Sequence, residues 1–279
     1  MGQKGTLELV IGDGPARDGV VFRGDHPWLD ARLASLYDAF EFSEDVPFYL
    51  ELAAAQGNRV LEVACGSGRL LLPLTQAGYQ VVGIDASPHM LDIARSKLDR
   101  AGVRADVVQA DMRAFTLAQA DFDLAIVAVK SLAYLLSPSD QLACLAAIHA
   151  HLRPGGVLAI DLMHPRPEWI AAPRGSMRDD LLQNVAAQGF TLSRVESVVN
   201  TDLAQQLRVI RSIYEVIDDS GVIVEKRFVE WTYRWMHRFE AEHLFERAGF
   251  SVEGVYGGYR REPFSSESPL MLFVGRKRS

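Results

Sequence analysis

Between residues 59 and 162 the sequence alternates short apolar segments with segments of helical periodicity, and this alternation constrains the fold more than any other feature. One helical segment opens with Ser87-Pro88, an N-cap residue followed by proline at the first helical position. Parallel strands need crossover connections of this kind, so the pattern predicts an α/β fold with a mostly parallel sheet. The predicted strands span residues 59–63, 80–84, 105–108, 122–127 and 156–162.

After residue 165 the pattern changes to an alternation of apolar and polar residues. Segments 190–199, 206–218 and 222–237 have the period of antiparallel strands, and residues 218–221 (DDSG) have the composition of a hairpin turn. The chain then returns to one helix and two strands, which we predict at 239–248, 250–256 and 270–275. Together these segments predict a Rossmann-like, doubly wound, mostly parallel seven-stranded sheet with an inserted antiparallel β lobe.

The same patterns divide the chain into three parts. Residues 1–25 are rich in glycine and weakly patterned, and we predict an N-terminal arm there. Two helices are expected next, at about 28–40 and after Ser43. The α/β domain is predicted to comprise 26–164 and 237–279, and the inserted lobe to span 165–236.

Composition excludes several classes of protein. The 279 residues include 29 Lys and Arg against 36 Asp and Glu, a net charge of −7, which argues against a nucleic-acid partner. Two cysteines, Cys65 and Cys144, form no disulfide framework and suit a reducing cytoplasm. No apolar run approaches the roughly 20 residues that cross a bilayer, so we expect no membrane association. We therefore predict a cytoplasmic enzyme or binding protein for small molecules.

The sharpest local feature is a glycine turn between the first predicted strand and the helix after it. Gly66 and Gly68 lie in this turn, and Asp85 follows 19 residues after Gly66, at the end of the second predicted strand. Glycine lets the backbone approach a ligand closely. A carboxylate at the end of the second strand can accept hydrogen bonds from both hydroxyls of a ribose. This combination predicts a nucleotide site at the carboxyl edge of the sheet.

Two residues favour S-adenosylmethionine (SAM) over NAD(P) as the nucleotide. Leu71 stands where the third glycine of a dinucleotide fingerprint would be. Glu62, at the end of the first strand, would repel a diphosphate but suits the ammonium of a methionine group. An NAD(P)-dependent oxidoreductase remains the alternative interpretation.

The segment from Glu62 to Gly68, EVACGSG, resembles the D/E-x-G-x-G-x-G loop of class I SAM-dependent methyltransferases, with Ala64 in place of the first glycine. Asp85 matches their ribose-binding acid, and residues 110–112 (ADM) resemble the segment beside the adenine. Segments 122–127 and 152–156 match the fourth strand and the approach to the fifth. The sequence is most similar to the small-molecule branch, which includes bacterial deoxyaminosugar N,N-dimethyltransferases and glycine N-methyltransferase-like enzymes.

This resemblance implies SAM as the cofactor and a small-molecule methyl acceptor. It also implies that Tyr37, in a helix before the sheet, covers the cofactor, and Tyr37 is a catalytic candidate as well. The cofactor-binding residues that it implies are Tyr37, Glu62, Ala64, Gly66, Gly68, Asp85, Ala86, Met90, Ala110, Asp111, Met112 and Val127.

Methyl transfer from a sulfonium is an in-line displacement that mainly requires alignment, so no catalytic triad is expected. His164, just past the fifth predicted strand, and His237, at the end of the third lobe strand, are candidate general bases. Lys130, after the fourth strand, is a candidate substrate contact.

The third lobe strand carries Trp231, Tyr233 and Trp235 on one face. These rings are predicted to form the lobe's core or a dimer face, with an aromatic substrate pocket as the alternative. Arg234 and Arg238 are predicted to be solvated, with an acidic substrate group as their alternative partner. No cluster of metal ligands is found, so no metal is expected.

We therefore predict a SAM-dependent methyltransferase that acts on nitrogen or oxygen of a small molecule. A non-catalytic SAM-binding protein is the third interpretation, because no obvious base is found. The lobe is predicted to serve as a homodimer interface or a lid.

Overall fold

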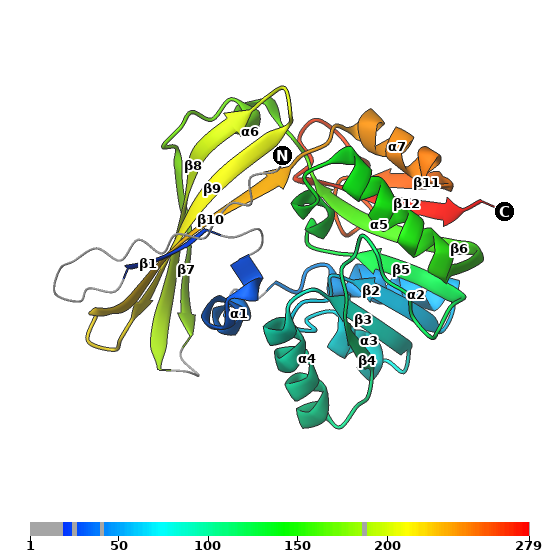
Figure 1. Ribbon diagram of the computed structural model, residues 1–279, viewed down its shortest axis with the longest axis horizontal. Coiled ribbons are helices and arrows are strands. Elements are labelled where there is room, and N and C mark those ends of the chain that lie inside the picture. The colour runs from blue at the N-terminus through cyan, green and yellow to red at the C-terminus, as the bar shows by residue number, and fades with distance from the viewer. Residues whose placement is uncertain (1–18, 24–26, 40–41, 186–188, 279) are drawn as a thin grey trace, which may run out of the picture.

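The computed structural model describes residues 19–23, 27–39, 42–185 and 189–278, which form two sheets joined by short helices (Figure 1). The larger sheet has seven strands in the order β11-β12-β6-β5-β2-β3-β4, and β12 runs antiparallel to β6 and β11. The predicted doubly wound sheet is confirmed. Its strands are β2 (Arg59–Val63), β3 (Gln80–Asp85), β4 (Asp106–Gln109), β5 (Phe122–Val127), β6 (Leu152–Met163), β11 (Phe250–Tyr256) and β12 (Leu270–Lys277).

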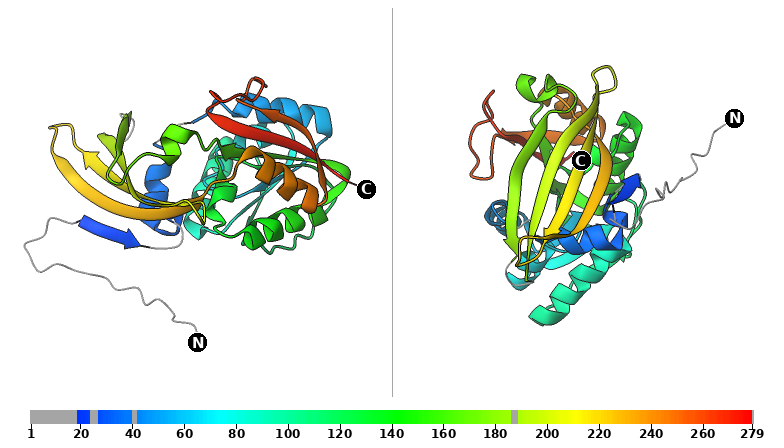
Figure 2. Two further views of the ribbon diagram at one scale, coloured as in Figure 1. Left: turned by 90° about the horizontal axis from the view of Figure 1, so that it is seen from above. Right: turned by 90° about the vertical axis from the view of Figure 1, so that its left-hand side faces the viewer.

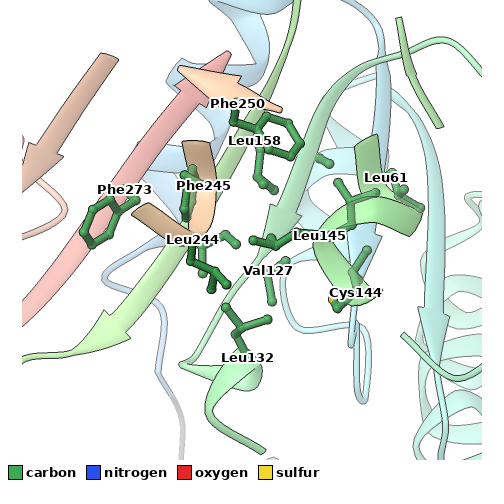
Figure 3. Packing of buried hydrophobic residues seen from close by; sticks show 14 of the residues in the cluster. Leu61, Val127, Leu132, Cys144, Leu145, Leu158, Leu244, Phe245, Phe250 and Phe273 are labelled. Atoms are coloured by element: carbon green, nitrogen blue, oxygen red, sulfur yellow. The ribbon is translucent and has the colours of Figure 1, made fainter. Parts of the chain in front are cut away.

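Helices cover both faces of this sheet. α2 (Val46–Gln56), α3 (Leu71–Gln76) and α4 (Pro88–Ala101) pack on one face. On the other face α5 (Pro138–His151) and α7 (Arg238–Arg247) contribute apolar side chains that meet those of the strands (Figure 3). None of the helices within the described ranges is long and apolar enough to cross a membrane.

The central strands are buried on both faces, which explains why their sequences are continuously apolar. Val127 and Leu158 point toward Leu145 and Leu244 in Figure 3, and the first three are 0% exposed. Helix α5 begins directly after Ser137, which caps it by accepting a hydrogen bond from the backbone N–H of Asp140. The fold therefore holds the carboxyl ends of β2, β3, β4 and β5 at one edge.

The smaller sheet follows the order β1-β10-β9-β8-β7. Its four antiparallel strands are inserted between β6 and α7, as the alternating pattern predicts, whereas β1 pairs in parallel with β10. β1 and β7 are not among the predicted strands, and β1 comes from the segment predicted as an arm. The strands are β1 (Gly19–Arg23), β7 (Met177–Val185), β8 (Phe190–Asp202), β9 (Leu207–Ile217) and β10 (Ile223–Arg234).

Short helices connect the two sheets. The helix expected at about 28–40 is divided into η1 (Pro27–Leu29) and α1 (Ala31–Tyr37), because Asp30 caps α1 with its side chain. Leu33 and Leu36 of α1 pack on the lobe sheet in a small apolar cluster. Figure 2 shows this sheet as strongly curved, with α1 on the side that faces the larger sheet. We call this side the core-facing side of the lobe.

Candidate cofactor and acceptor site

The glycine turn follows β2 and has left-handed backbone at three positions. Ala64, Gly66 and Gly68 have φ of 59°, 54° and 76°. A Cβ at Gly68 would lie 3.0 Å from the Cβ of Ala94 on α4, so glycine permits close packing there. Ala64 adopts the same conformation with a Cβ, which is unfavourable for an L-residue.

Asp85 connects this turn to the next loop. One carboxylate oxygen, Oδ2, accepts a hydrogen bond from the backbone N–H of Gly66 at 2.9 Å. The other, Oδ1, accepts from the backbone N–H of Ser87 at 2.8 Å. The carboxylate therefore fixes the ends of β2 and β3 relative to each other, at the position where a ribose is predicted.

Glu62 is buried at the same edge, with 3% of its surface exposed. Among the described residues its Oε2 atom has no hydrogen-bond partner. The pKa of this carboxyl is raised to about 8, mainly by burial; Arg69 opposes the rise, and Asp45 and Asp85 contribute to it. A buried carboxyl oxygen without a donor is costly. An ammonium such as that of SAM would supply the missing donor, so the residues present fit this cofactor.

Ion pairs hold the turn from the N-terminal side. Arg69, the residue after Gly68, pairs with the fully buried Asp45 at 2.6 Å. Asp38 accepts from the Ser67 hydroxyl at 2.5 Å and pairs with Lys97 at 2.7 Å. Sequence reasoning missed these acids, because their partners lie 24 to 59 residues away along the chain.

The other predicted cofactor residues lie along the same edge. Ala86 is exposed beside Asp85, and the N–H of Met90 is capped by Ser87. Ala110 donates its N–H to the carbonyl of Asp85 at 3.0 Å. The remaining three lie at or after the ends of β4 and β5: Asp111, which pairs with Arg113 at 2.5 Å, Met112, which packs on the core, and Val127, which is fully buried.

Comparison with known proteins decides between the two cofactors. A family model described as a methyltransferase domain matches residues 60–156. Over 262 residues the chain is 31% identical to the putative methyltransferase YqeM of Bacillus subtilis, covering 88% of this chain and 95% of the relative. The chain belongs to the class I SAM-dependent methyltransferases. SAM is its cofactor, and the NAD(P)-dependent alternative is not supported.

Two further similarities are to other methyltransferases. The chain is 27% identical to a dTDP-3-amino-3,4,6-trideoxy-alpha-D-glucopyranose N,N-dimethyltransferase of Streptomyces venezuelae, covering 81% of this chain and 92% of the relative. The CcbJ methyltransferase of Streptomyces caelestis has the same fold, with a TM-score of 0.77 at 21% identity, covering 92% of this chain and 100% of that one.

In this methyltransferase Tyr37 lies between the glycine turn and the lobe. Its ring packs edge-on against Trp28 at 4.8 Å between centroids. Burial raises the pKa of its hydroxyl, and Glu62 and Arg69 are among the charged groups that act on it. Tyr37 and Glu62 therefore interact electrostatically, and the role of Tyr37 over the cofactor stays a prediction.

Both candidate histidines are engaged by other groups. His164 Nδ1 lies 2.8 Å from the carbonyl oxygen of Ser268, and its ring packs against Phe264. His237 is exposed and forms a capping box with Glu240 at the start of α7. The described residues contain no group of three or more potential metal ligands. The proposed proton transfer by either histidine stays a prediction.

Lys130 follows β5 in a strained turn. Val129 and Lys130 both have left-handed backbone, with φ of 55° and 58°. The Lys130 ammonium lies 3.7 Å from the fully buried Asp161 of β6, and Tyr259 donates a hydrogen bond to the same carboxylate at 2.9 Å. Lys130 therefore has a buried counter-ion, and Asp161 and Tyr259 are residues that sequence reasoning missed.

Two aromatic residues of β10, Trp231 and Tyr233, lie on the core-facing side of the lobe, and Trp235 directly follows this strand. Trp231 stacks on Tyr134 of η2 (Ser131–Tyr134) at 5.8 Å between centroids, so its ring faces the core and not an outer surface. Tyr233 and Trp235 pack against Trp169 of α6 (Pro167–Ile170). These rings form one cluster beside the sheet's carboxyl edge.

One expectation about the lobe arginines is wrong. Arg234, predicted to be solvated, is only 6% exposed and pairs with Glu240 at 2.7 Å. It also donates to Gln141 and Gln206, so its guanidinium is fully occupied by protein groups. Arg238 is exposed, as expected, and pairs with Glu242. Arg234 is therefore not available to hold an acidic substrate group.

Proposed function

We propose that this methyltransferase transfers a methyl group to an amine nitrogen of a polar small molecule that binds between the glycine turn and the core-facing side of the lobe. The observation that carries this proposal is the position of Glu196. Its Oε1 accepts from the Ser212 hydroxyl at 3.1 Å and lies 3.7 Å from Arg194 Nε. A carboxylate suits an amine, which gains positive charge as it is methylated.

Several hydroxyl groups surround this carboxylate. Burial is the main cause of the raised pKa of Tyr134, and Tyr37, Tyr214 and Glu196 also raise it. Burial also raises the pKa of Tyr214 to about 12, with Glu196 and Tyr37 among its charged neighbours. The phenols therefore stay protonated at neutral pH and form a polar path from Tyr37 to Glu196. The amino-sugar N,N-dimethyltransferase similarity supports the same acceptor class.

When bound, SAM supplies an electrophilic methyl group on a sulfonium leaving group. In the proposal Glu62 binds the ammonium of the cofactor and Asp85 binds its ribose. The acceptor nitrogen forms the new bond to the methyl carbon as the carbon–sulfur bond breaks, and the electron pair of that bond stays on sulfur. The amine then loses one proton to solvent or to a nearby base, for which Glu196 and His164 are candidates.

The proposal also includes the setting of the enzyme. We expect a cytoplasmic protein with no nucleic-acid or membrane partner, consistent with its negative charge. The proposed homodimer face is the outer side of the lobe sheet. Ile213 and Phe228 lie there between two ion pairs, Arg211 with Glu230 and Lys226 with Glu215. Sedimentation equilibrium tests this part, and a monomer at all concentrations would remove it.

A methylation screen tests the proposed reaction. Pairs of small molecules that differ only in an amine or a hydroxyl at one position are incubated with the enzyme and SAM, and added CH₂ units are detected by mass. We expect turnover of amines and little turnover of the matching alcohols. Turnover of alcohols alone would contradict nitrogen as the acceptor, and SAM binding without any product would favour a non-catalytic protein.

A further inference from the structure

Within the described part of the chain, three buried N–H groups on the core-facing side of the lobe have no acceptor. They are Nε of Arg208, Nε1 of Trp231 and Nε1 of Trp235. Arg208 and Trp235 are 1% and 2% exposed, so water does not reach them as it reaches surface groups. Each of these atoms can only donate a hydrogen bond, and an unpaired buried donor is costly. A group that pairs with these three donors therefore has to supply hydrogen-bond acceptors.

Strand register and contacts with Trp169 bring the three donors together. Arg208 of β9 lies opposite Tyr233 of β10, and the next residue on the same side of β9, Ile210, lies opposite Trp231. Trp235 directly follows β10 and donates its backbone N–H to the carbonyl of Gln206. Alternate residues of a strand point to one side of a sheet, so Arg208 and Trp231 share one side. The Trp235 ring joins them through Trp169, which also contacts the Arg208 guanidinium.

Arg208 also has no carboxylate partner among the described residues. Its two terminal nitrogens donate to the carbonyl oxygens of Trp169 and Ala172, and its guanidinium lies 4.4 Å from the centroid of the Trp169 ring. Burial lowers its pKa. Arg234 of β10 and Arg211 of β9, in contrast, both have glutamate partners. Arg208 is thus a buried cation whose charge is not balanced by an ion pair in this part of the chain.

We propose that Arg208, Trp231 and Trp235 bind an anionic, oxygen-rich group of the methyl acceptor, a phosphate or a carboxylate. Such a group supplies both the missing charge and several acceptor oxygens, which a neutral ligand does not. The inference rests on the proposed function because it places this group on the molecule that is methylated. It differs from the alternative that the sequence left open, in which Arg234 and Arg238 hold an acidic substrate group.

The cluster is continuous with the rest of the site. Trp231 stacks on Tyr134, whose pKa Tyr37 helps to raise, and Glu62 in turn helps to raise the pKa of Tyr37. An acceptor with its nucleophile near Tyr37 therefore extends along β10 toward Arg208. The segment that contains α6 covers the guanidinium through its two carbonyl contacts, so this segment has to move when the anion enters.

Anion titration tests the site directly. Three of the four tryptophans lie in this cluster, so tryptophan fluorescence reports on it. Pyrophosphate, inorganic phosphate and acetate are titrated separately into the protein with S-adenosylhomocysteine present. We expect saturable binding of at least one anion, and the preferred one distinguishes a phosphate from a carboxylate.

Variants identify the residues responsible. Arg208→Gln is expected to weaken anion binding by at least about tenfold, and Trp231→Phe, which keeps the ring and removes the N–H, by about five- to tenfold. Arg208→Lys keeps the positive charge and serves as the test if Arg208→Gln does not fold. It should bind the anion with intermediate affinity. The control is Arg211→Gln, on the opposite side of β9, which should bind as the wild type does. No saturable binding, or unchanged binding by Arg208→Gln, would overturn the inference.

A second arm separates this inference from the proposed function. Amines with and without a phosphate or carboxylate at a distance from the nitrogen are compared as acceptors. Equal kcat/KM for charged and uncharged amines would overturn the anion site and leave amine methylation intact. Anion binding that depends on Arg208, without methylation of any amine, would overturn the proposed function and leave the anion-binding residues in place.

Discussion

The two halves of the site differ in how the chain builds them. The cofactor half consists of one short loop and one aspartate 19 residues later, each at the end of a parallel strand. The acceptor half combines η2, α6 and three strands of the lobe. A local sequence can specify the first, whereas only the folded lobe brings the second together. Variants in the two halves should therefore affect the cofactor and the acceptor separately.

The largest effect is expected at Asp85. Asp85→Ala removes a carboxylate that holds the N–H groups of Gly66 and Ser87 and is predicted to bind the ribose. Losing two or more charge-assisted hydrogen bonds should weaken binding of both SAM and S-adenosylhomocysteine by at least about 100-fold. Isothermal titration calorimetry measures this. Asp92→Ala, on the exposed side of α4, is the control, and equal affinities for the two variants would contradict the assignment.

Glu62 should affect binding and stability in opposite directions. Glu62→Gln is expected to weaken SAM binding by about tenfold because the ammonium loses a charged partner. The same change should stabilise the ligand-free protein at neutral pH, because it removes a carboxyl that burial disfavours as an ion.

The pH dependence gives the sign of this stability effect. The pKa of Glu62 is raised from 4.5 to about 8, so between these values the folded state keeps a proton that the unfolded state has lost. Below pH 4.5 Glu62 is protonated in both states and does not lower the free energy of unfolding. As the pH rises toward 8 the free energy of unfolding declines, by on the order of 3 kcal/mol at pH 7. Thermal unfolding of the ligand-free protein should show this decline, and Glu62→Gln should flatten it. Identical profiles would show that Glu62 is ionised in the folded protein.

A change at Glu196 should leave the cofactor half intact. Glu196→Gln is expected to lower kcat/KM for an amine acceptor by about tenfold while the Kd for SAM stays unchanged. Glu230→Gln, which removes a carboxylate from the outer side of the same lobe, is the control. If the Glu196 variant instead weakened SAM binding and left the acceptor kinetics unchanged, the separation of the two halves would be wrong.

The difference between a locally encoded loop and a lobe assembled by tertiary pairing also explains which parts of the fold the sequence could predict. The strands around the glycine turn are apolar, regular and bounded by clear turn residues, so the larger sheet and its order of helices follow from local patterns. β7 contains Arg178, Asp179 and Asp180 in succession and lacks clean alternation, and only pairing with β8 makes it a strand. Local patterns are weak evidence where tertiary pairing decides the conformation.

The partners of charged residues are even harder to predict from local sequence. Nothing near Arg234 in the sequence identifies Glu240, Gln206 and Gln141 as its partners, because three different elements supply them. Nothing near Arg208 in the sequence indicates that it lacks a carboxylate partner among the described residues. The sequence predicted solvated arginines, with an acidic substrate group as the alternative, and the anion site proposed above assigns that role to Arg208 instead.

The smallest effect is expected at Ala64, where the cofactor loop departs from the family's glycine. Its φ of 59° is unfavourable for alanine and neutral for glycine, so Ala64→Gly relieves strain in the folded state. Glycine also increases the entropy of the unfolded chain, which cancels part of the gain. The net expectation is about 0.5 kcal/mol of stabilisation, or about 1–2 °C in Tm. Ala54→Gly, at an exposed position inside α2, should instead destabilise by about 1 kcal/mol. Both variants lose one methyl group, so opposite shifts in Tm isolate the backbone conformation of the loop, and equal losses would show that Ala64 is not strained.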